Sequence, residues 1–415
     1  MFSHAGHAVA HGRACGLPDE VTRRVACWPN RWLRCVAMPS MWSRRRVGAP
    51  LIVIVLLAIL TVFLLLVFSA ANPSGTLTAL ILASTSMLVV LLCYRWLDRW
   101  EPEPRRLLQM AFLWGASVAV VLAVLLETFG SSVATTRPLV SKTFDMAAIQ
   151  APFIEEAAKG LFLLIMMTGR RRLALNSLTD CMVYAGVTAV GFAWMEDIVY
   201  IAPADSPDKM AAVAIARLIF GPFAHPLFTT MTGIGVFVAL RRHGFWPKAF
   251  AILTGYLAAV IMHASWNTSL AAGGGQLFLV TYVFWMFPVF LLMVLLAMLS
   301  RRHEQQLVAD QLPAMVAGGL ITANEATWLG SIRTRKLAMA QASRLGGRPA
   351  AQSLKNFSTQ VVHLAFMRDR IDRGFGDRQV WSQQCEDAYG VVAARAAAPV
   401  LYAMAGYYAP ILARR

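Results

Sequence analysis

The sequence predicts an all-α polytopic membrane protein with about eight transmembrane helices and a small cytoplasmic helical C-terminal tail. Composition is the first reason: the 415 residues are 58% hydrophobic and 14% charged, with a mean hydropathy of +0.56. Soluble domains average about 25% charged residues. The second reason is pattern, because long apolar runs alternate with short basic blocks along the chain.

Eight apolar runs approach or exceed the roughly 20 residues that a helix needs to cross a bilayer. They cover residues 50–70, 77–97, 107–128, 145–168, 179–202, 211–240, 248–271 and 276–300. The sixth run is too long for one straight crossing. Arg217 and Pro222 near its start predict an interfacial first turn or a kink, and we interpret Arg217 as an interfacial side chain that reaches the headgroups.

The basic residues that give the net charge of +16 are distributed as in a membrane protein of defined topology. Arginine and lysine fall in the segment before the first run, in every second connection (98–106, 169–173 and 241–248) and in the tail. Cytoplasmic loops of membrane proteins carry this excess of positive charge. We therefore expect both termini in the cytoplasm and no nucleic-acid partner, and the six cysteines form no CxxC pair of the zinc-finger type.

Three parts follow from these patterns: a basic cytoplasmic segment (1–49), a transmembrane helical domain that holds the candidate catalytic residues (50–300), and a cytoplasmic tail (301–415). The tail is polar and has a helical pattern, which "LGGRPA" at residues 345–350 interrupts. The sequence thus predicts at least two helical stretches in the tail.

A small set of polar side chains lies inside the runs, where a charge costs at least about 2.5–3.5 kcal/mol. A rise of about 1.5 Å per residue places this set between the outer surface and the midplane, so its members can meet. From the fourth to the seventh run it comprises Glu155, Glu156, Lys159, Glu196, Asp197, His225, His263 and Asn267. We expect Asp197 to face an aqueous vestibule, and the others to form one site.

Carboxylates combined with imidazoles are the ligands of a divalent metal that activates water for hydrolysis. Glu155 and Lys159 are four residues apart, so the lysine can keep one carboxylate ionised, whereas Glu156 points about 100° away and is free for another task. Asn267 follows His263 by one turn and is placed to bind an oxyanion or to orient a ligand. No HExxH motif is present, so the ligands must come from separate helices, and zinc is the default metal for them.

These residues resemble the motifs of the PrsW family of intramembrane proteases, a relative of the CAAX-processing and Abi-type membrane proteases. "EEAAK" (155–159) matches EExxK, "FAWMEDIVY" (192–200) matches FxxxExxxY, and "HASWN" (263–267) is similar to the last motif. The resemblance implies a metal-dependent protease acting on a membrane protein or peptide in the lipid bilayer. It implies Glu155 and Glu156 as base and ligand-side carboxylates and His263 as a metal contact. Together with the spacing arguments above, the candidate catalytic residues are Glu155, Glu156, Lys159 and Asn267, and the candidate metal ligands are Glu196, His225 and His263.

CAAX-type relatives have a histidine where this chain has Glu196. Either Glu196 is itself a ligand or His225 takes that place. We hypothesise an intramembrane metallopeptidase of a prokaryotic plasma (inner) membrane that cleaves near the outer leaflet. The alternatives are a proton- or ion-coupled transporter that uses the same buried residues, and an inactive family member that acts as a scaffold.

Overall fold

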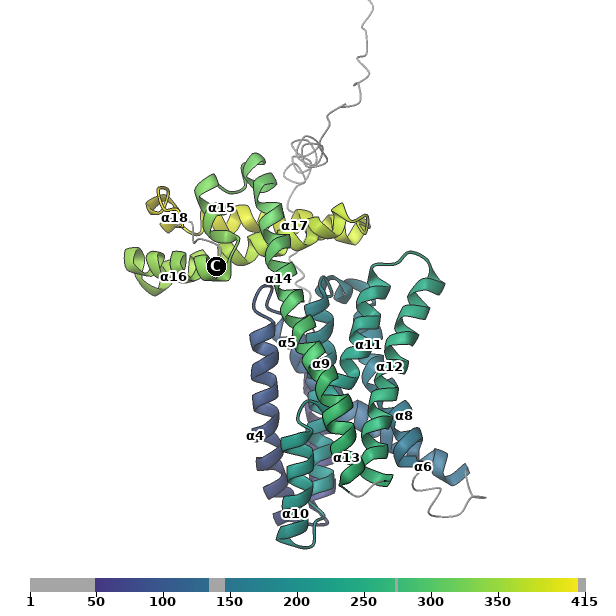
Figure 1. The fold of residues 1–415 in the computed structure, drawn as a ribbon. Helices are drawn as coiled ribbons and strands as arrows, with labels where there is room; N and C mark the ends of the chain where they lie inside the picture. Colours follow the sequence, from purple (N-terminus) through teal and green to yellow (C-terminus); the bar gives the residue numbers. More distant parts are fainter. Residues whose placement is uncertain (1–48, 134–145, 273–274, 410–415) are drawn as a thin grey trace, which may run out of the picture. The chain divides into compact units, whose positions relative to one another are not determined.

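The computed structural model describes residues 49–133, 146–272 and 275–409, and these residues form helices without a β-strand (Figure 1). The predicted all-α class is thereby confirmed. The predicted N-terminal segment, residues 1–49, falls almost entirely outside the described residues. The described chain divides into two compact units, a membrane unit (44–306 with 370–380) and a tail unit (307–369 with 381 onward).

Seven helical runs of the described residues are long and apolar enough to cross a membrane. Two are single helices at the start of the unit, α3 (Leu51–Ser69) and α4 (Pro73–Leu97), and a third combines α5 (Arg105–Leu113), the π-helical turn η1 (Trp114–Ala119) and α6 (Val120–Val133). The others are α9 (Leu178–Ile201), α10 to α11 (Pro207–Leu240), α12 (Phe245–Ala272), and α13 (Gln276–Thr281) with η5 (Tyr282–Met286) and α14 (Phe287–Ala317).

The predicted fourth crossing, residues 145–168, is helical over nearly its whole length. It consists of the π-helical turn η2 (Met146–Gln150) and the 16-residue helix α8 (Ala151–Met166), followed by the 3₁₀ turn η3 (Gly169–Ala174). Because part of it is π-helical, its α-helix alone extends about 24 Å of the roughly 30 Å hydrocarbon layer. The helix ends just before Gly169, which has φ +58°.

The break predicted in the sixth run is confirmed. Helix α10 (Pro207–Ala214) continues into the π-helical turn η4 (Ile215–Phe220), the chain then turns at residues 221–223, and α11 (Ala224–Leu240) follows. A Cβ atom on Gly221 would lie 2.9 Å from the carbonyl oxygen of Arg217, so this turn needs glycine.

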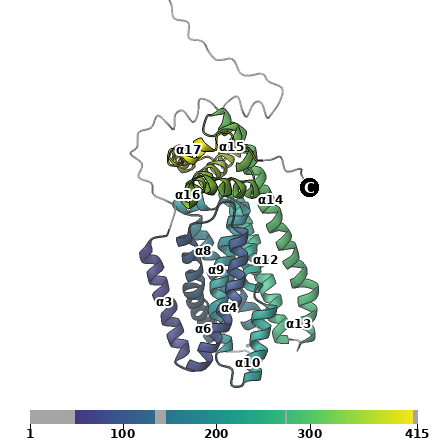
Figure 2. The same cartoon turned by 90° about the vertical axis from the view of Figure 1, so that its left-hand side faces the viewer.

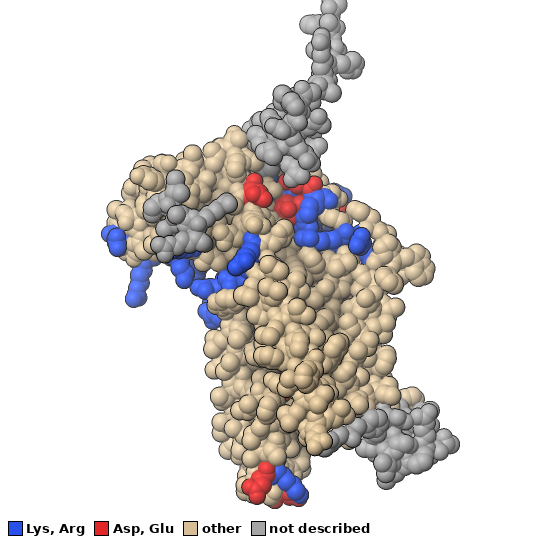
Figure 3. Space-filling view, in the orientation of Figure 1, with Lys and Arg blue, Asp and Glu red and all other residues tan. Residues whose placement is uncertain are grey.

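Helix α9 is the centre of the membrane unit. It packs against α4, α5, η1, α8 and α11, which surround it in Figures 1 and 2. It is the least apolar of the seven crossing runs and the most buried, whereas α3 is the most apolar and among the least buried. Lipid is the apolar solvent for the outer helices, so polar side chains collect on the inner one. The outer surface of the unit accordingly shows an uncharged band between charged ends (Figure 3).

The tail unit contains the end of α14 and the helices α15 (Ala323–Leu329), α16 (Ile332–Asp372), α17 (Arg378–Ala396) and α18 (Val400–Ala403). The predicted interruption at "LGGRPA" is confirmed as a kink in α16, where Gly347 has φ +68°. The fully buried Trp328 packs against Phe357, and Arg395 is 2.7 Å from the carboxylate of Glu325.

Candidate metal centre

Helices α8, α9, α11 and α12 carry the polar set and pack directly on one another. Helices α11 and α12 cross closely at Gly235 and Gly255. A Cβ atom on Gly235 would lie 2.6 Å from the carbonyl oxygen of Ala251, and one on Gly255 would meet backbone at 2.5 Å. Small residues allow such close packing between membrane helices. The crossing brings the rings of His225 and His263 together, with their centroids 4.9 Å apart and their planes nearly perpendicular.

Glu156 on α8 has hydrogen-bond partners on both carboxylate oxygens. Its Oε1 lies 2.6 Å from Lys159 Nζ and 3.0 Å from His263 Nδ1, and its Oε2 accepts a hydrogen bond of 2.8 Å from Thr229 Oγ1. The Glu156 side chain is fully buried. It therefore orients His263 with Nδ1 toward the carboxylate and Nε2 toward the rest of the site.

Glu155 is the less satisfied of the two adjacent glutamates. Its Oε2 is buried and has no hydrogen-bond partner among the described residues. The nearest polar atoms are Lys159 Nζ at 3.6 Å and His263 Nε2 at 3.7 Å. The sequence suggested Lys159 as the partner of Glu155, but the lysine is closer to Glu156, one residue nearer along the helix. A buried acceptor without a donor is costly, so Glu155 is the carboxylate with room for a ligand.

Glu196 on α9 lies against His225 on α11. One of its oxygens, Oε2, is 2.7 Å from His225 Nε2 and 2.6 Å from Arg217 Nη2. Arg217 also places Nε 2.6 Å from Asp197 Oδ1. This corrects two expectations, because the Arg217 and Asp197 side chains are only 17% and 4% exposed rather than interfacial and solvated. Their mutual ion pair explains the burial, since neither charge is left uncompensated.

Two aromatic residues of α9 cover the two cations of the site. The ring centroid of Phe192 is 4.3 Å from Lys159 Nζ, and that of Tyr200 is 4.4 Å from Arg217 Cζ. Phe192, Glu196 and Tyr200 recur every four residues and therefore lie on one helix face. These cation–π contacts give a physical role to the aromatic residues that flank Glu196 in the sequence.

Three residues bring one ligand atom each within 4.8 Å of one another: Glu155, His225 and His263. All three are buried, and they come from three different helices, as the missing HExxH motif required. The sequence left open whether Glu196 is a ligand or His225 takes that place, and this group contains His225. Glu196 lies behind His225, where the guanidinium of Arg217 and the imidazole contact its Oε2. His225 Nδ1 faces the site, at 3.2 Å from Lys159 Nζ.

A divalent cation fits this donor set by charge as well as by ligand type. Six ionisable side chains are linked by ion pairs, and with neutral histidines their formal charges leave a net −2 in a buried layer. They are Glu155, Glu156, Glu196, Asp197, Lys159 and Arg217. One divalent ion would neutralise this excess, and it would supply a partner for the orphaned oxygen of Glu155.

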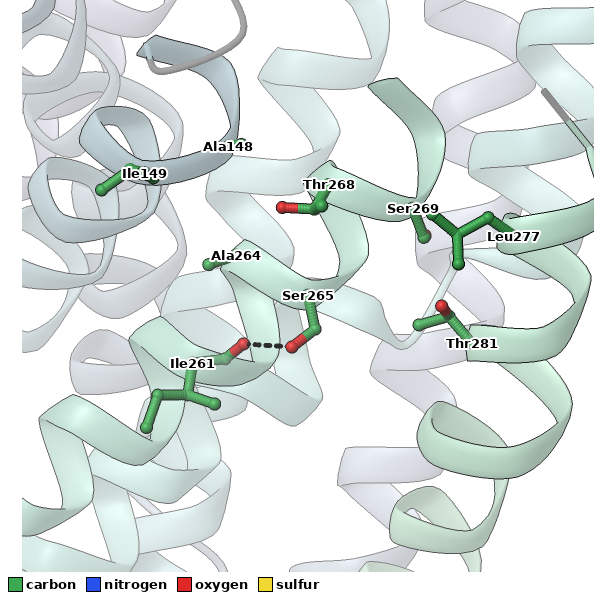
Figure 4. A pocket seen from close by; sticks show the side chains of 9 residues that line it. All are labelled: Ala148, Ile149, Ile261, Ala264, Ser265, Thr268, Ser269, Leu277 and Thr281. Atoms are coloured by element: carbon green, nitrogen blue, oxygen red, sulfur yellow. Dashed lines mark hydrogen bonds between the residues drawn. The ribbon is translucent and has the colours of Figure 1, made fainter. Parts of the chain in front are cut away.

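Asn267 is half-buried on α12, one turn after His263. A cavity of about 440 Å³ lies beside the same stretch of helix. Ala264, Ser265 and Thr268 of α12 line one side of it, and η2 and α13 supply the other sides (Figure 4). Ala264 directly follows His263 in the chain, so the cavity is next to the site along α12.

Sequence reasoning missed one contributor to the site, Thr229, and placed another, Arg217, at the membrane interface. Thr229 follows His225 by four residues, a spacing that places both on one face of α11 and could have identified it. Arg217 could not be found in this way, because its contact with α9 depends on the turn between η4 and α11.

Residues 103–293 match the family model described as PrsW family intramembrane metalloprotease, and this range includes every residue of the polar set. Neither the curated proteins nor the solved structures contain a match to the chain.

Proposed function

The chain carries, in residues 103–293, the domain of the PrsW family of intramembrane metalloproteases, and from this premise we propose how it works. The protein hydrolyses a peptide bond in a membrane-associated protein near the outer leaflet, at the layer formed by α8, α9, α11 and α12. The observation that carries the proposal is the unpartnered oxygen of Glu155 beside two imidazoles.

We assign His225, His263 and Glu155 to a divalent cation, with zinc as the first choice for two imidazoles and a carboxylate. When bound, the cation supplies a Lewis acid and lowers the pKa of a water molecule. Glu155 has two oxygens, so one can face the cation while the other accepts the proton of the attacking water.

The remaining residues hold this arrangement in place. Glu156 orients His263 through Nδ1, and Lys159 keeps Glu156 ionised from 2.6 Å. Glu196 orients His225 through Nε2 in the same way. Carboxylates behind metal-binding histidines fix their tautomer and raise their basicity. We assign to Asn267 the stabilisation of the oxyanion, because its amide lies one turn from His263.

The cavity beside α12 supports a site for the substrate segment. A peptide bond must leave its helix before it can be cleaved, and its freed N–H and C=O groups then need partners within the membrane. The hydroxyls of Ser265, Thr268 and Thr281 line the cavity and can supply them, while Ala148 and Ala264 leave room for the backbone.

The basic blocks of the chain support a prokaryotic plasma-membrane protein with both termini in the cytoplasm. In that orientation the polar layer lies between the midplane and the outer surface.

The proposal is tested with the purified full-length protein in detergent or liposomes. Stoichiometric zinc in the wild type, lost in His263→Ala, together with membrane-protein fragments that appear only when the gene is present, is the expected result. Cleavage that survives both Glu155→Ala and His263→Ala would overturn it. Substrate-driven proton flux without proteolysis would instead support the transporter alternative.

A further inference from the structure

Arg217 occupies an unusual position in the backbone. It belongs to η4, a π-helical turn, and such turns contain one extra residue and are frequent at functional sites. The turn directs the guanidinium toward α9, where it meets three residues on one stretch of helix. Nη2 is 2.6 Å from Glu196, Nε is 2.6 Å from Asp197, and Cζ lies 4.4 Å from the ring centroid of Tyr200.

The contact with Glu196 extends to the metal centre. The Glu196 oxygen that accepts from Arg217 Nη2 is also the oxygen 2.7 Å from His225 Nε2. A proton on Nε2 is required for that second hydrogen bond when the imidazole is neutral. The lone pair of His225 then belongs to Nδ1, which faces the interior of the site beside Lys159.

We propose that Arg217 is a positioning residue of the metal centre: it clamps Glu196 against His225, which selects the tautomer with Nδ1 unprotonated and able to accept, as it does from Lys159, and it keeps Glu196 from becoming a ligand itself. The inference rests on the proposed function. The reason for arginine is geometric, since a planar guanidinium presents N–H groups to two carboxylates at once. A lysine offers a single compact charge and cannot hold both in this arrangement.

Arg217 contacts two carboxylates, and their different contacts make it possible to distinguish positioning of His225 from simple charge compensation. Asp197 pairs with Nε of Arg217, whereas Glu196 pairs with Nη2 and also touches His225 directly. Removing the charge of Asp197 therefore leaves the Arg217–Glu196–His225 chain intact. Removing the guanidinium breaks that chain and leaves both carboxylates without their cation.

The experiment measures zinc affinity of the metal-depleted full-length protein by competition with a chromophoric chelator, alongside its melting temperature. We expect Arg217→Lys and Arg217→Ala to bind zinc about 10–100-fold more weakly, as is typical when the outer partner of a metal ligand is lost. Added methylguanidinium, at concentrations that do not denature the protein, should restore part of the affinity of Arg217→Ala. Asp197→Asn should lose less zinc affinity than either Arg217 variant, and the exposed control Lys209→Ala should bind zinc as the wild type does.

Wild-type zinc affinity in folded Arg217→Ala would overturn the inference. An equal loss in Asp197→Asn and Arg217→Lys would also overturn it, because that result indicates charge compensation alone. Should Arg217→Ala fail to fold, the zinc affinities of Arg217→Lys and Asp197→Asn still distinguish positioning of His225 from charge compensation. Absence of zinc binding in the wild type would instead overturn the metal centre of the proposed function, and the inference with it.

Discussion

Helix α9 has a buried polar cluster at each end, and the two clusters satisfy their carboxylates by different means. At its start, Asp180 accepts hydrogen bonds from the backbone N–H groups of Asn176 and Ser177, at 2.8 and 2.7 Å, and from Ser177 Oγ at 2.8 Å. Glu103 accepts from the hydroxyl of Tyr184 at 2.6 Å. These donors are neutral groups.

At the other end of α9, the partners of the carboxylates are charged or can become charged. Glu196 and Asp197 share a guanidinium, Glu156 meets an ammonium and an imidazole, and one oxygen of Glu155 meets no donor among the described residues. Neutral donors that belong to the helix start make a cluster complete by itself. A cluster with an orphaned carboxylate oxygen beside two imidazoles has room for an external cation. The comparison therefore separates a structural cluster from a functional one.

The largest effect should follow substitution of the orphaned glutamate. We expect Glu155→Gln to lower the cleavage rate by about 10²–10⁴-fold, since an amide is a poor proton acceptor and a poor ligand. Folding should be unaffected, because Glu155 Oε2 makes no hydrogen bond in the described structure. Cleavage of a membrane substrate and zinc content are the measurements.

The matched control is Glu103→Gln in the structural cluster, which makes the same chemical change at a buried carboxylate. It should retain cleavage and zinc binding. Loss of cleavage in Glu103→Gln, or its retention in Glu155→Gln, would contradict the distinction between the two clusters.

The second effect concerns the glutamate that holds His263. Glu156→Gln keeps the shape but removes the charge that Lys159 and His263 contact, so zinc affinity should fall by about 10–100-fold. The protein should also lose stability, because the fully buried Lys159 loses its closest counter-charge. Chelator competition and thermal unfolding measure the two losses. Unchanged zinc affinity would show that Glu156 does not position His263.

A smaller effect is expected for Tyr184→Phe. The substitution removes the hydroxyl that donates to Glu103 and leaves a buried carboxylate with one donor fewer. Stability should fall by about 1–3 kcal/mol, while zinc affinity and cleavage of the remaining folded protein stay at wild-type values. A change in zinc affinity would indicate that the two ends of α9 are coupled.

The smallest effect is a pH dependence of stability at the structural cluster. Burial, with a contribution from the neighbouring Glu101, raises the pKa of Asp98 from 3.8 to about 7, although the backbone N–H of Glu103 opposes this. The native protein therefore binds this proton more tightly than the unfolded chain. The contribution of Asp98 to stability is full below pH 3.8 and is lost as the pH rises toward 7.

We expect the free energy of unfolding of the wild type, obtained from thermal unfolding, to fall between pH 5 and pH 8 by more than that of Asp98→Asn, with a difference on the order of 1 kcal/mol. Asp205→Asn, at an exposed position, is the control and should follow the wild type. Identical pH profiles for the wild type and Asp98→Asn would show that Asp98 is not protonated in the folded protein.

Much of the fold was predictable because a membrane restricts the secondary structures that a spanning segment can adopt. Apolar runs of sufficient length and the glycine break at residues 345–350 are local properties. Seven of the eight predicted runs are candidate spans, and the break appears where the pattern places it. The π-helical start of the fourth run and the 3₁₀ turn after it were not predicted, since hydropathy does not show where an α-helix gives way to such turns. The polar set was also visible in the sequence, because charged residues within a membrane run are rare.

The sequence by itself determined the membrane class, the helices that carry the site and the residue types that compose it, because burial in lipid leaves a strong compositional pattern. Only the tertiary structure decided which atoms meet. It paired Lys159 more closely with Glu156 than with Glu155, and it left Oε2 of Glu155 without a hydrogen-bond partner among the described residues. It also placed Arg217 against Glu196 and not at the membrane interface. Those outcomes depend on helix rotation and on a turn between two helices, which are set by packing between segments far apart in the chain.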